Sequence, residues 1–184
     1  YISVTGVQTC ALPISKELKT QRFELLGVHD ADHNLAAHDN AKLTEIESGY
    51  IRDVVKLQED CGLPFITDGD FRRRSWWTDF LLSFTGLSIS YDGKTPITLI
   101  NAAGEKRPIA GIKVSGKIKP RDSGMVKSFS FLKSIAKKTP KVTIPGPPIV
   151  HFLRDADFVP SVYKDIEEFW IDLIAAYKAE IRKL

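Results

Sequence analysis

The sequence predicts an α/β fold, because helical segments with one apolar face alternate with short apolar segments bounded by glycine, proline or aspartate. Its 184 residues suffice for one domain with a sizeable core. The alternation stops after the strongest helical segment, 161–184, where a further strand is expected. A closed (β/α)8 barrel needs about 250 residues. We therefore expect a partial TIM barrel.

The first fourteen residues differ in composition from the rest of the chain. VTGVQTCALPI (4–14) is short and apolar, whereas the charged, helix-like SKELKTQRFELL begins at Ser15. One reading frame of a common sequencing-library adapter encodes the same eleven residues. A signal peptide would need a basic start and a longer apolar core. We interpret Tyr1–Ile14 as a non-native, adapter-derived segment and expect the folded domain to span 15–184.

The first half of that domain predicts a helix, a strand and a polar loop. The helix covers 41–61, with Asp39 or Asn40 as its N-cap. Its expected apolar face consists of Leu43, Ile46, Tyr50, Val54, Leu57 and Cys61. LPFIT (63–67) follows as a short buried strand, and 72–84 as a loop that enters a short helix.

The middle of the chain predicts a β-hairpin insertion at about 87–108. Two strand-like segments there, 87–91 and 96–100, are separated by an Asp-Gly pair that favours a tight turn. The segment 109–119 is expected to be a strand that returns to the main fold.

The last third predicts a helix at 125–136, a second buried strand at 141–148 and a long helix at 161–184 with Ser161 as its cap. The expected apolar faces are Val126, Phe129, Leu132 (or Phe131) and Ile135 on the first helix, and Val162, Ile166, Phe169, Trp170, Leu173, Tyr177, Ile181 and Leu184 on the second.

Composition argues against several classes of partner. The net charge of +3 is small and its basic residues are scattered, so we expect no nucleic-acid binding. No apolar run approaches the 18 residues or so that a membrane span needs, so we expect no membrane association. Once Cys10 is set aside, Cys61 is the single native cysteine, which suits a reducing cytoplasm.

The densest group of chemistry-bearing side chains is TDGDFRRRSWWTDF (67–80). Its acids directly follow a predicted strand, at the end where α/β barrels hold their active sites. Carboxylates suit an ammonium group or a proton, arginines an anionic ligand, and tryptophans a flat ring. The same spacing also fits a polar loop with a helix-capping Asp, surface Arg and core Trp. The residues concerned are Asp68, Asp70, Arg72, Arg73, Arg74, Trp76 and Trp77.

Histidines give weaker candidates. In HDADHNLAAHD (29–39), His29 and His33 have a spacing that can share a metal ion on a helix. Because Asp and Asn favour turns, we expect a solvated loop there instead. His151 follows the second predicted strand and is a candidate for the active face, with a packed or surface histidine as the alternative.

Three segments share a pattern with one enzyme family: IRDVVKLQEDCGLPFITDGDFRRRSWWTDFL (51–81), KVTIPGPP (141–148) and the helix YKDIEEFWIDLIAAYKAEIRKL (163–184). The order helix, Q-E-x-x-G-L, short strand, T-D-G-[ED]-x-x-R and D-F is specific. On these segments the chain resembles the cobalamin-independent methionine synthase family, in particular its shorter single-barrel relatives. The resemblance implies the N-terminal half of a TIM barrel of the methionine synthase/uroporphyrinogen decarboxylase-like type.

The resemblance also implies an activity. Such enzymes are cytoplasmic and transfer a methyl group from 5-methyltetrahydrofolate to the thiol of homocysteine, which a zinc ion holds as a thiolate. The family's zinc ligands, a His-x-Cys pair, a Glu and a later Cys, belong to the second half of the barrel. We therefore expect no metal ligand in this chain, no turnover by this part alone, and small-molecule partners: a thiol and a methyl donor.

The resemblance assigns binding roles and no catalytic residue. Asp70 stands where the family binds the amino group of the amino-acid thiol, and where its full synthases have Glu. Gly116, Lys117 and Phe152 or Leu153 fall near the family's folate contact. The substrate-binding residues expected in total are Asp68, Asp70, Arg72, Arg73, Trp77, Lys117 and His151.

Two other functions remain open. One is a related zinc-dependent alkyl transferase that uses another thiol, as epoxyalkane–coenzyme M transferases do. The other is a non-catalytic binding module built from the TDGD loop and the hairpin. An open reading frame that continues past Leu184 into His-x-Cys and Cys motifs would indicate the enzyme, and a stop codon the module.

Overall fold

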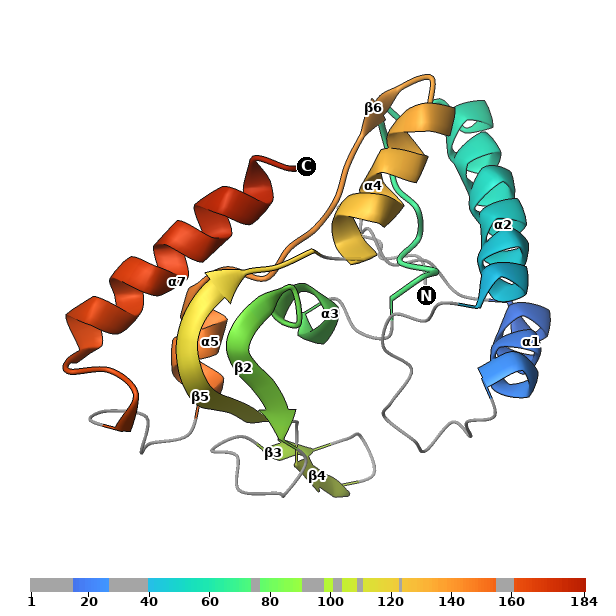
Figure 1. Cartoon of the computed structure of the whole chain (residues 1–184). Helices are drawn as coiled ribbons and strands as arrows, with labels where there is room; N and C mark the ends of the chain where they lie inside the picture. Colours follow the sequence, from blue (N-terminus) through green and yellow to red (C-terminus); the bar gives the residue numbers. More distant parts are fainter. Residues whose placement is uncertain are drawn as a thin grey trace. The chain divides into compact units, whose positions relative to one another are not determined.

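The structure, a computed structural model, describes residues 15–26, 40–73, 77–90, 98–100, 104–108, 111–122, 124–154 and 161–184. Helices and short strands are mixed along the chain (Figure 1). In chain order, the elements are α1 (Lys16–Leu26), α2 (Ala41–Asp60), β1 (Phe65–Ile66), α3 (Thr78–Leu81), β2 (Phe84–Ser90), β3 (Thr98–Ile100), β4 (Lys106–Pro108), β5 (Gly111–Pro120), α4 (Gly124–Ile135), β6 (Thr139–Pro140), α5 (Pro148–Leu153) and α7 (Ile166–Ile181).

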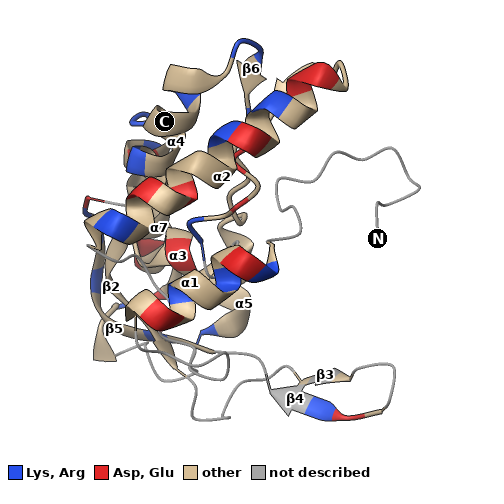
Figure 2. Cartoon of the chain, turned by 90° about the vertical axis from the view of Figure 1, so that its right-hand side faces the viewer, with Lys and Arg blue, Asp and Glu red and all other residues tan. Residues whose placement is uncertain are grey.

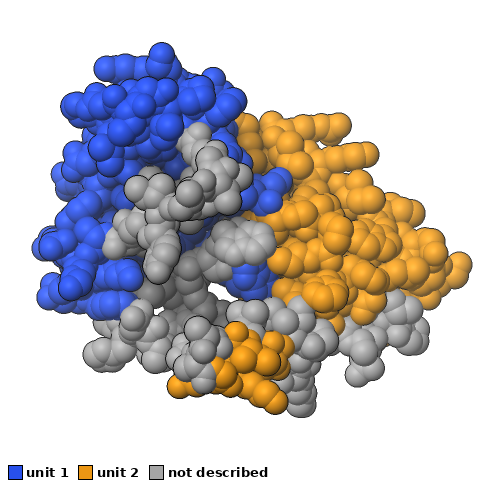
Figure 3. Space-filling model, turned by 180° about the vertical axis from the view of Figure 1, so that it is seen from behind, with its two compact units in different colours: residues 1–79, 124–144 blue, residues 80–123, 145–184 orange. Residues whose placement is uncertain are grey.

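The strands form three two-stranded sheets in the described part of the chain: β1 with β6 in parallel, and β2 with β5 and β3 with β4 antiparallel. The predicted α/β class is confirmed, and the barrel is not closed among these residues. The chain divides into two compact units, coloured separately in Figure 3: 1–79 with 124–144 (unit 1), and 80–123 with 145–184 (unit 2).

Several predictions concern residues outside the described ranges. They are the adapter-derived segment 1–14, the histidine-rich segment 29–39, the side chains of Arg74 and Trp76, and the Asp-Gly turn at 92–93.

In unit 1, α2 begins where the sequence predicts. Asn40 is the N-cap, and its Oδ1 accepts a hydrogen bond from the Leu43 backbone N–H at 3.0 Å. Gly62, with φ of +72°, follows the helix end. The predicted apolar face is partly wrong, since Leu57 is 61% exposed and Cys61 is exposed. The face that is buried consists of Leu43, Glu47, Ser48, Ile51, Val55 and Gln58.

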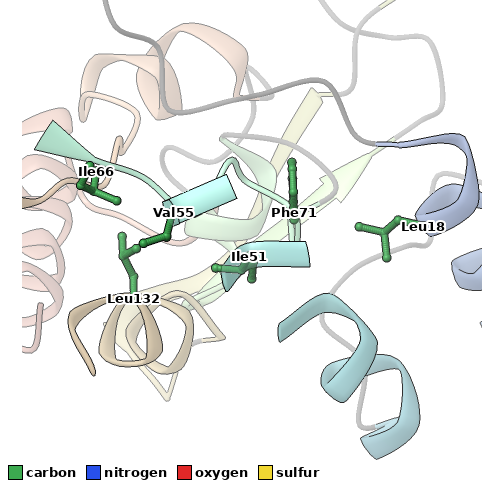
Figure 4. Close-up of a cluster of buried hydrophobic side chains, with 6 residues drawn as sticks. All are labelled: Leu18, Ile51, Val55, Ile66, Phe71 and Leu132. Carbon is green, nitrogen blue, oxygen red and sulfur yellow. The ribbon is translucent and has the colours of Figure 1, made fainter. Parts of the chain in front are cut away.

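The core of unit 1 draws on α1, α2, β1, α4 and the loop after β1 (Figure 4). Burial of each large apolar side chain contributes about 1.5–3 kcal/mol, which holds these elements together. Charged residues of both signs lie along α1 and α2 (Figure 2). The buried cluster comprises Leu18, Ile51, Val55, Ile66, Phe71 and Leu132.

The prediction of a second strand at 141–148 is wrong. Strand β6 lies just before it, and the ladder with β1 continues for one more bond, from Lys141 N–H to Ile66 C=O at 2.8 Å. Residues 141–146 have no regular structure, and α5 begins at Pro148. Proline has no N–H for a sheet ladder but suits the first turn of a helix, which explains the difference.

In unit 2, β2 and β5 pair through a large irregularity. Between the pairs Thr85↔Lys119 and Leu87↔Val114, β2 advances by two residues and β5 by five. Among the extra residues of β5, the Ile118 N–H donates to the Tyr163 hydroxyl at 2.7 Å. The buried Tyr163 side chain therefore satisfies a backbone group that the sheet leaves without a partner.

Within the region of the expected hairpin insertion, β3 and β4 form an antiparallel pair from Thr98↔Pro108 to Ile100↔Lys106. The segment 87–91 was expected to join this hairpin, and that is wrong for its described residues, because β2 pairs with β5.

The last helix, α7, begins at Ile166, with Asp165 as its N-cap and not Ser161 as predicted. The Asp165 carboxylate accepts from the Glu168 backbone N–H at 2.9 Å. Phe169, Leu173 and Tyr177 are buried as predicted, whereas Ile181 is 50% exposed. None of the helices in the described ranges has the length and apolar character that a membrane crossing needs.

Replacing Tyr163 with phenylalanine is expected to lower the free energy of unfolding by about 1–2 kcal/mol, because the Ile118 N–H loses its acceptor inside the protein. Urea denaturation measures the loss. The half-buried Tyr50 on α2 gives the control Tyr50→Phe, expected to change stability by less than about 0.5 kcal/mol. Equal effects of the two changes would contradict the role of Tyr163.

Candidate functional site

The loop 67–73 directly follows β1, and a buried side chain of α2 fixes its first residue. The Gln58 amide accepts from the Thr67 N–H at 3.0 Å and donates to the Thr67 C=O at 2.9 Å. It also donates to Val54 C=O at 3.0 Å. Gln58 thus supplies Thr67 with both the donor and the acceptor that a neighbouring strand would provide, so the loop leaves the strand from a fixed point.

Two consecutive residues of the loop have left-handed backbones: Gly69 with φ of +69° and Asp70 with φ of +61°. Two side chains support the turn, since Thr67 Oγ1 accepts from the Gly69 N–H at 3.2 Å and Asp68 Oδ1 from the Asp70 N–H at 3.1 Å. Aspartate tolerates this conformation better than most residues, but it is uncommon outside glycine. A left-handed residue held by its surroundings is typical of functional sites.

The two acids of the loop share one guanidinium. Arg73 Nη2 lies 2.6 Å from Asp70 Oδ1 and 3.4 Å from Asp68 Oδ1, and Arg73 Nη1 donates to the Thr143 C=O at 3.1 Å. All three charged side chains are buried. The trio carries two negative charges and one positive charge when ionised, so it favours the approach of a further cation.

The environment of Asp70 raises the pKa of its carboxyl above the ordinary value. Burial is the main cause, Asp68 and Asp79 add to it, and Arg73 opposes it. A cationic ligand on this carboxylate would favour its ionised form in the same way as Arg73 does.

Arg72 extends to the other side of the loop, towards α2. Its Nη2 donates to Ser48 Oγ at 2.6 Å, its Nε lies 3.7 Å from Glu47 Oε2, and its guanidinium is 4.6 Å from the centre of the Phe131 ring. Burial lowers the pKa of Arg72, and Glu47 opposes this. Trp77, half-buried, belongs to the same unit just before α3.

The other two predicted site residues belong to unit 2. Lys117 Nζ lies 2.6 Å from Glu168 Oε1 and 4.1 Å from the centre of the Tyr163 ring. His151 does not end a strand, as was expected: it lies on α5, exposed, with its ring centre 5.4 Å from that of Trp170. Partial burial and then the Arg154 charge lower the His151 pKa.

Among the residues near the predicted folate contact, Phe152 is 64% exposed and Leu153 is buried. Gly116 lies in β5, opposite Gly86.

The structure adds three buried polar residues that the sequence did not single out as site residues: Arg22, Glu47 and Gln58. Gln58 stands in the Q-E-x-x-G-L pattern, which was the available signal. For Glu47, the available signal was its spacing: it stands four residues before Ile51, so the two residues share the buried face of α2.

The described residues do not fit a zinc ion. No group of three or more histidine, cysteine, aspartate or glutamate side chains that could hold a metal is present among them. Asp68 and Asp70 are already bridged by Arg73, and Cys61 is exposed at the end of α2.

The chain is structurally similar to one class of protein, the B12-independent methionine synthase-like proteins, and it covers roughly half of those chains. One is a Listeria monocytogenes protein whose assignment as a vitamin-B12-independent methionine synthase is provisional. It matches 94% of this chain and 45% of its own, with a TM-score of 0.66 and 26% identity. Another is a B12-independent methionine synthase from Shewanella, solved with selenomethionine. It matches 79% of this chain and 40% of its own, with a TM-score of 0.59; at 18% identity it supports the fold alone.

Two curated relatives, the uncharacterized proteins YxjH and YxjG of Bacillus subtilis, are 35% identical over 142 residues and 36% identical over 143 residues. Each match spans 77% of this chain and 36% of the relative, so the chain spans about a third of their length. No family model matches the chain. Both relatives are uncharacterized, so the similarity to methionine synthase-like proteins rests on the solved structures, and the activity is left to be tested.

Proposed function

We propose that the chain contributes part of the thiol-binding half of a methionine synthase-like S-methyltransferase. In this proposal Asp70 accepts a hydrogen bond from the ammonium group of homocysteine, and the sulfur receives a methyl group from 5-methyltetrahydrofolate or a related donor. The partners are therefore two small molecules, an amino-acid thiol and a methyl donor.

The observation that carries the proposal is the Asp70 carboxylate itself. It is buried, in a left-handed backbone conformation, and in a trio with one negative charge in excess. An ammonium group supplies the missing positive charge and up to three donors, so it matches this site better than an anion or a neutral ring does.

The described residues offer no zinc ligands, so the proposal routes no step through a metal at this loop. In the proposal, the loop binds and orients the amino-acid end of the thiol. Any zinc ligands would come from other parts of the whole protein.

The test compares homocysteine with 4-mercaptobutanoate, which is homocysteine without the amino group. It uses the intact protein, with whatever further segments its gene encodes. Asp70→Asn keeps a residue type that tolerates the left-handed backbone but removes the charge. We expect affinity for homocysteine to fall by about 10- to 100-fold, because a hydrogen bond to a charged group contributes about 1.5–3 kcal/mol. Affinity for 4-mercaptobutanoate should stay within about twofold.

Calorimetry and the KM for methyl transfer provide the two readouts. The matched control is Asp60→Asn, the same substitution at an exposed aspartate that pairs with Lys56 on the surface of α2. If Asp70→Asn weakens the binding of both thiols equally, or the binding of neither, Asp70 does not bind the amino group. The latter result would favour a related transferase whose thiol has no amino group.

A further inference from the structure

We propose that Glu47 is a positioning residue for Asp70: through Arg22 and Arg72 it fixes the end of the loop that holds the Asp70 carboxylate. The inference rests on the proposed function where its test measures thiol binding. A second measurement, of the Asp70 conformation by NMR, depends on the geometry alone.

Glu47 joins two elements to the loop from the middle of α2. Its Oε1 lies 3.4 Å from Arg22 Nε on α1, and its Oε2 lies 3.7 Å from Arg72 Nε. Its side chain is 1% exposed. A carboxylate this deeply buried needs cationic partners, and both come from outside its own helix.

Arg22 carries the connection to the loop backbone. Its Nη1 donates to the Phe71 C=O at 3.0 Å, although the two residues lie 49 positions apart in the sequence. Phe71 directly follows Asp70, and its ring belongs to the unit 1 core. The side chain of Arg72, the next residue, is held by Glu47 and Ser48. Two consecutive loop residues are thus fixed from α2 and α1.

The other end of the loop is fixed by Gln58 at Thr67. Asp70 lies between the two anchors, and its left-handed φ of +61° persists because both ends are held. Loss of the Glu47 anchor frees one end. The Asp70 backbone can then relax towards a commoner conformation, which moves the carboxylate relative to Arg73 and to any ligand.

The test uses Glu47→Gln, Glu47→Asp and the matched control Glu45→Gln, which makes the same change at an exposed position of α2. The first readout is the ratio of affinities for homocysteine and 4-mercaptobutanoate in the intact protein. This ratio does not depend on the fraction of folded protein, so a merely structural role leaves it unchanged. We expect Glu47→Gln to lower it by about tenfold, since a displacement of about 1 Å can cost about a hundredfold. Glu47→Asp, which keeps the charge, should restore part of it.

The second readout needs no ligand. In protein labelled selectively at aspartate, NMR gives the HN–Hα coupling of Asp70, which depends on φ, and the shift of its carboxyl carbon. Both should change in Glu47→Gln and stay fixed in Glu45→Gln. If Glu47→Gln does not fold, Glu47→Asp carries both readouts, with smaller changes in the same direction.

The outcomes separate the two proposals. An unchanged Asp70 coupling and carboxyl shift in a folded Glu47 variant overturns the positioning role, whatever the ligands do. If the Asp70 NMR signals change in the Glu47 variants but Asp70→Asn leaves the ratio of thiol affinities unchanged, the proposed ligand is overturned and the positioning role stands. If Asp70→Asn changes the ratio of thiol affinities but a folded Glu47 variant does not, the effect of Glu47 on binding is overturned.

Discussion

Replacing Arg73 with methionine is expected to lower the free energy of unfolding by about 3–5 kcal/mol at neutral pH. Arg73 is the shared partner of Asp68 and Asp70, and it also donates to the Thr143 C=O. Removing one side of a buried ion pair leaves the other charges without compensation, which costs more than the pair itself contributes. Methionine keeps most of the length of the apolar stem, so the change reports mainly on charge.

The loss should depend on pH in a definite direction. The pKa of Asp70 already lies above the ordinary value of 3.8, and Arg73 opposes that rise. Without Arg73 the folded-state pKa increases further, while the unfolded-state value stays the same. Stability linked to this carboxyl is therefore fully present below the unfolded pKa and is lost as pH rises through the folded pKa.

Urea denaturation of both proteins between about pH 4 and pH 8 measures this dependence. The difference between wild type and Arg73→Met should be smallest at the acid end and grow with pH. Arg52→Met is the matched control, because Arg52 is exposed and lies 5.3 Å from the centre of the Phe131 ring. Arg52→Met should lower the free energy of unfolding by about 0.5–1 kcal/mol at every pH, which is the contribution of an exposed cation–π contact. A constant difference for Arg73→Met across this range would contradict a buried, proton-linked cluster.

The sequence located the loop of the candidate site but not the residues that hold it. A strand followed by T-D-G-D predicted Asp68 and Asp70 correctly as neighbours after β1. The predicted apolar face of α2 ran through Leu57 and Cys61, whereas the buried face runs through Glu47 and Gln58. Hydrophobic periodicity passes over these two residues because they are polar, although they are buried with partners. Those partners, Arg22, Arg72 and the Thr67 backbone, come from other segments and follow no local pattern.

The errors in secondary structure have local physical causes. The segment 141–148 contains β-branched residues that favour a strand, but its prolines cannot donate to a ladder, so sheet pairing ends near Lys141 and a helix begins at Pro148. The last helix begins later than expected because Asp165 caps it with its carboxylate. Because α5 begins at Pro148, His151 lies on a helix of unit 2 and not at a strand end.

Replacing Gly86 with alanine is expected to cost about 2–5 kcal/mol, from two separate penalties. Gly86 has φ of +78°, a conformation that costs an L-residue about 1–2 kcal/mol. A Cβ there would lie 2.4 Å from the Gly116 carbonyl oxygen and 2.6 Å from that of Lys117, and relief of such an overlap costs about 1–3 kcal/mol more. Because both obstacles are backbone atoms of the irregular part of β5, no side-chain rotation relieves them.

Gly104 separates the two penalties. Its φ of +79° equals that of Gly86 within a degree, but among the described residues no heavy atom outside its chain neighbours lies within 4 Å of an added Cβ. Gly104→Ala should therefore lose only the conformational part, about 1–2 kcal/mol in urea denaturation. Across the sheet, a Cβ on Gly116 would meet Gly86 Cα at an ordinary 3.7 Å, so Gly116→Ala should cost less than about 1 kcal/mol. Equal losses at 86 and 104 would show that β5 can move away from β2. Unequal losses in the expected order mean that the absence of a Cβ at Gly86 is what lets the Gly116 and Lys117 backbone lie so close to β2.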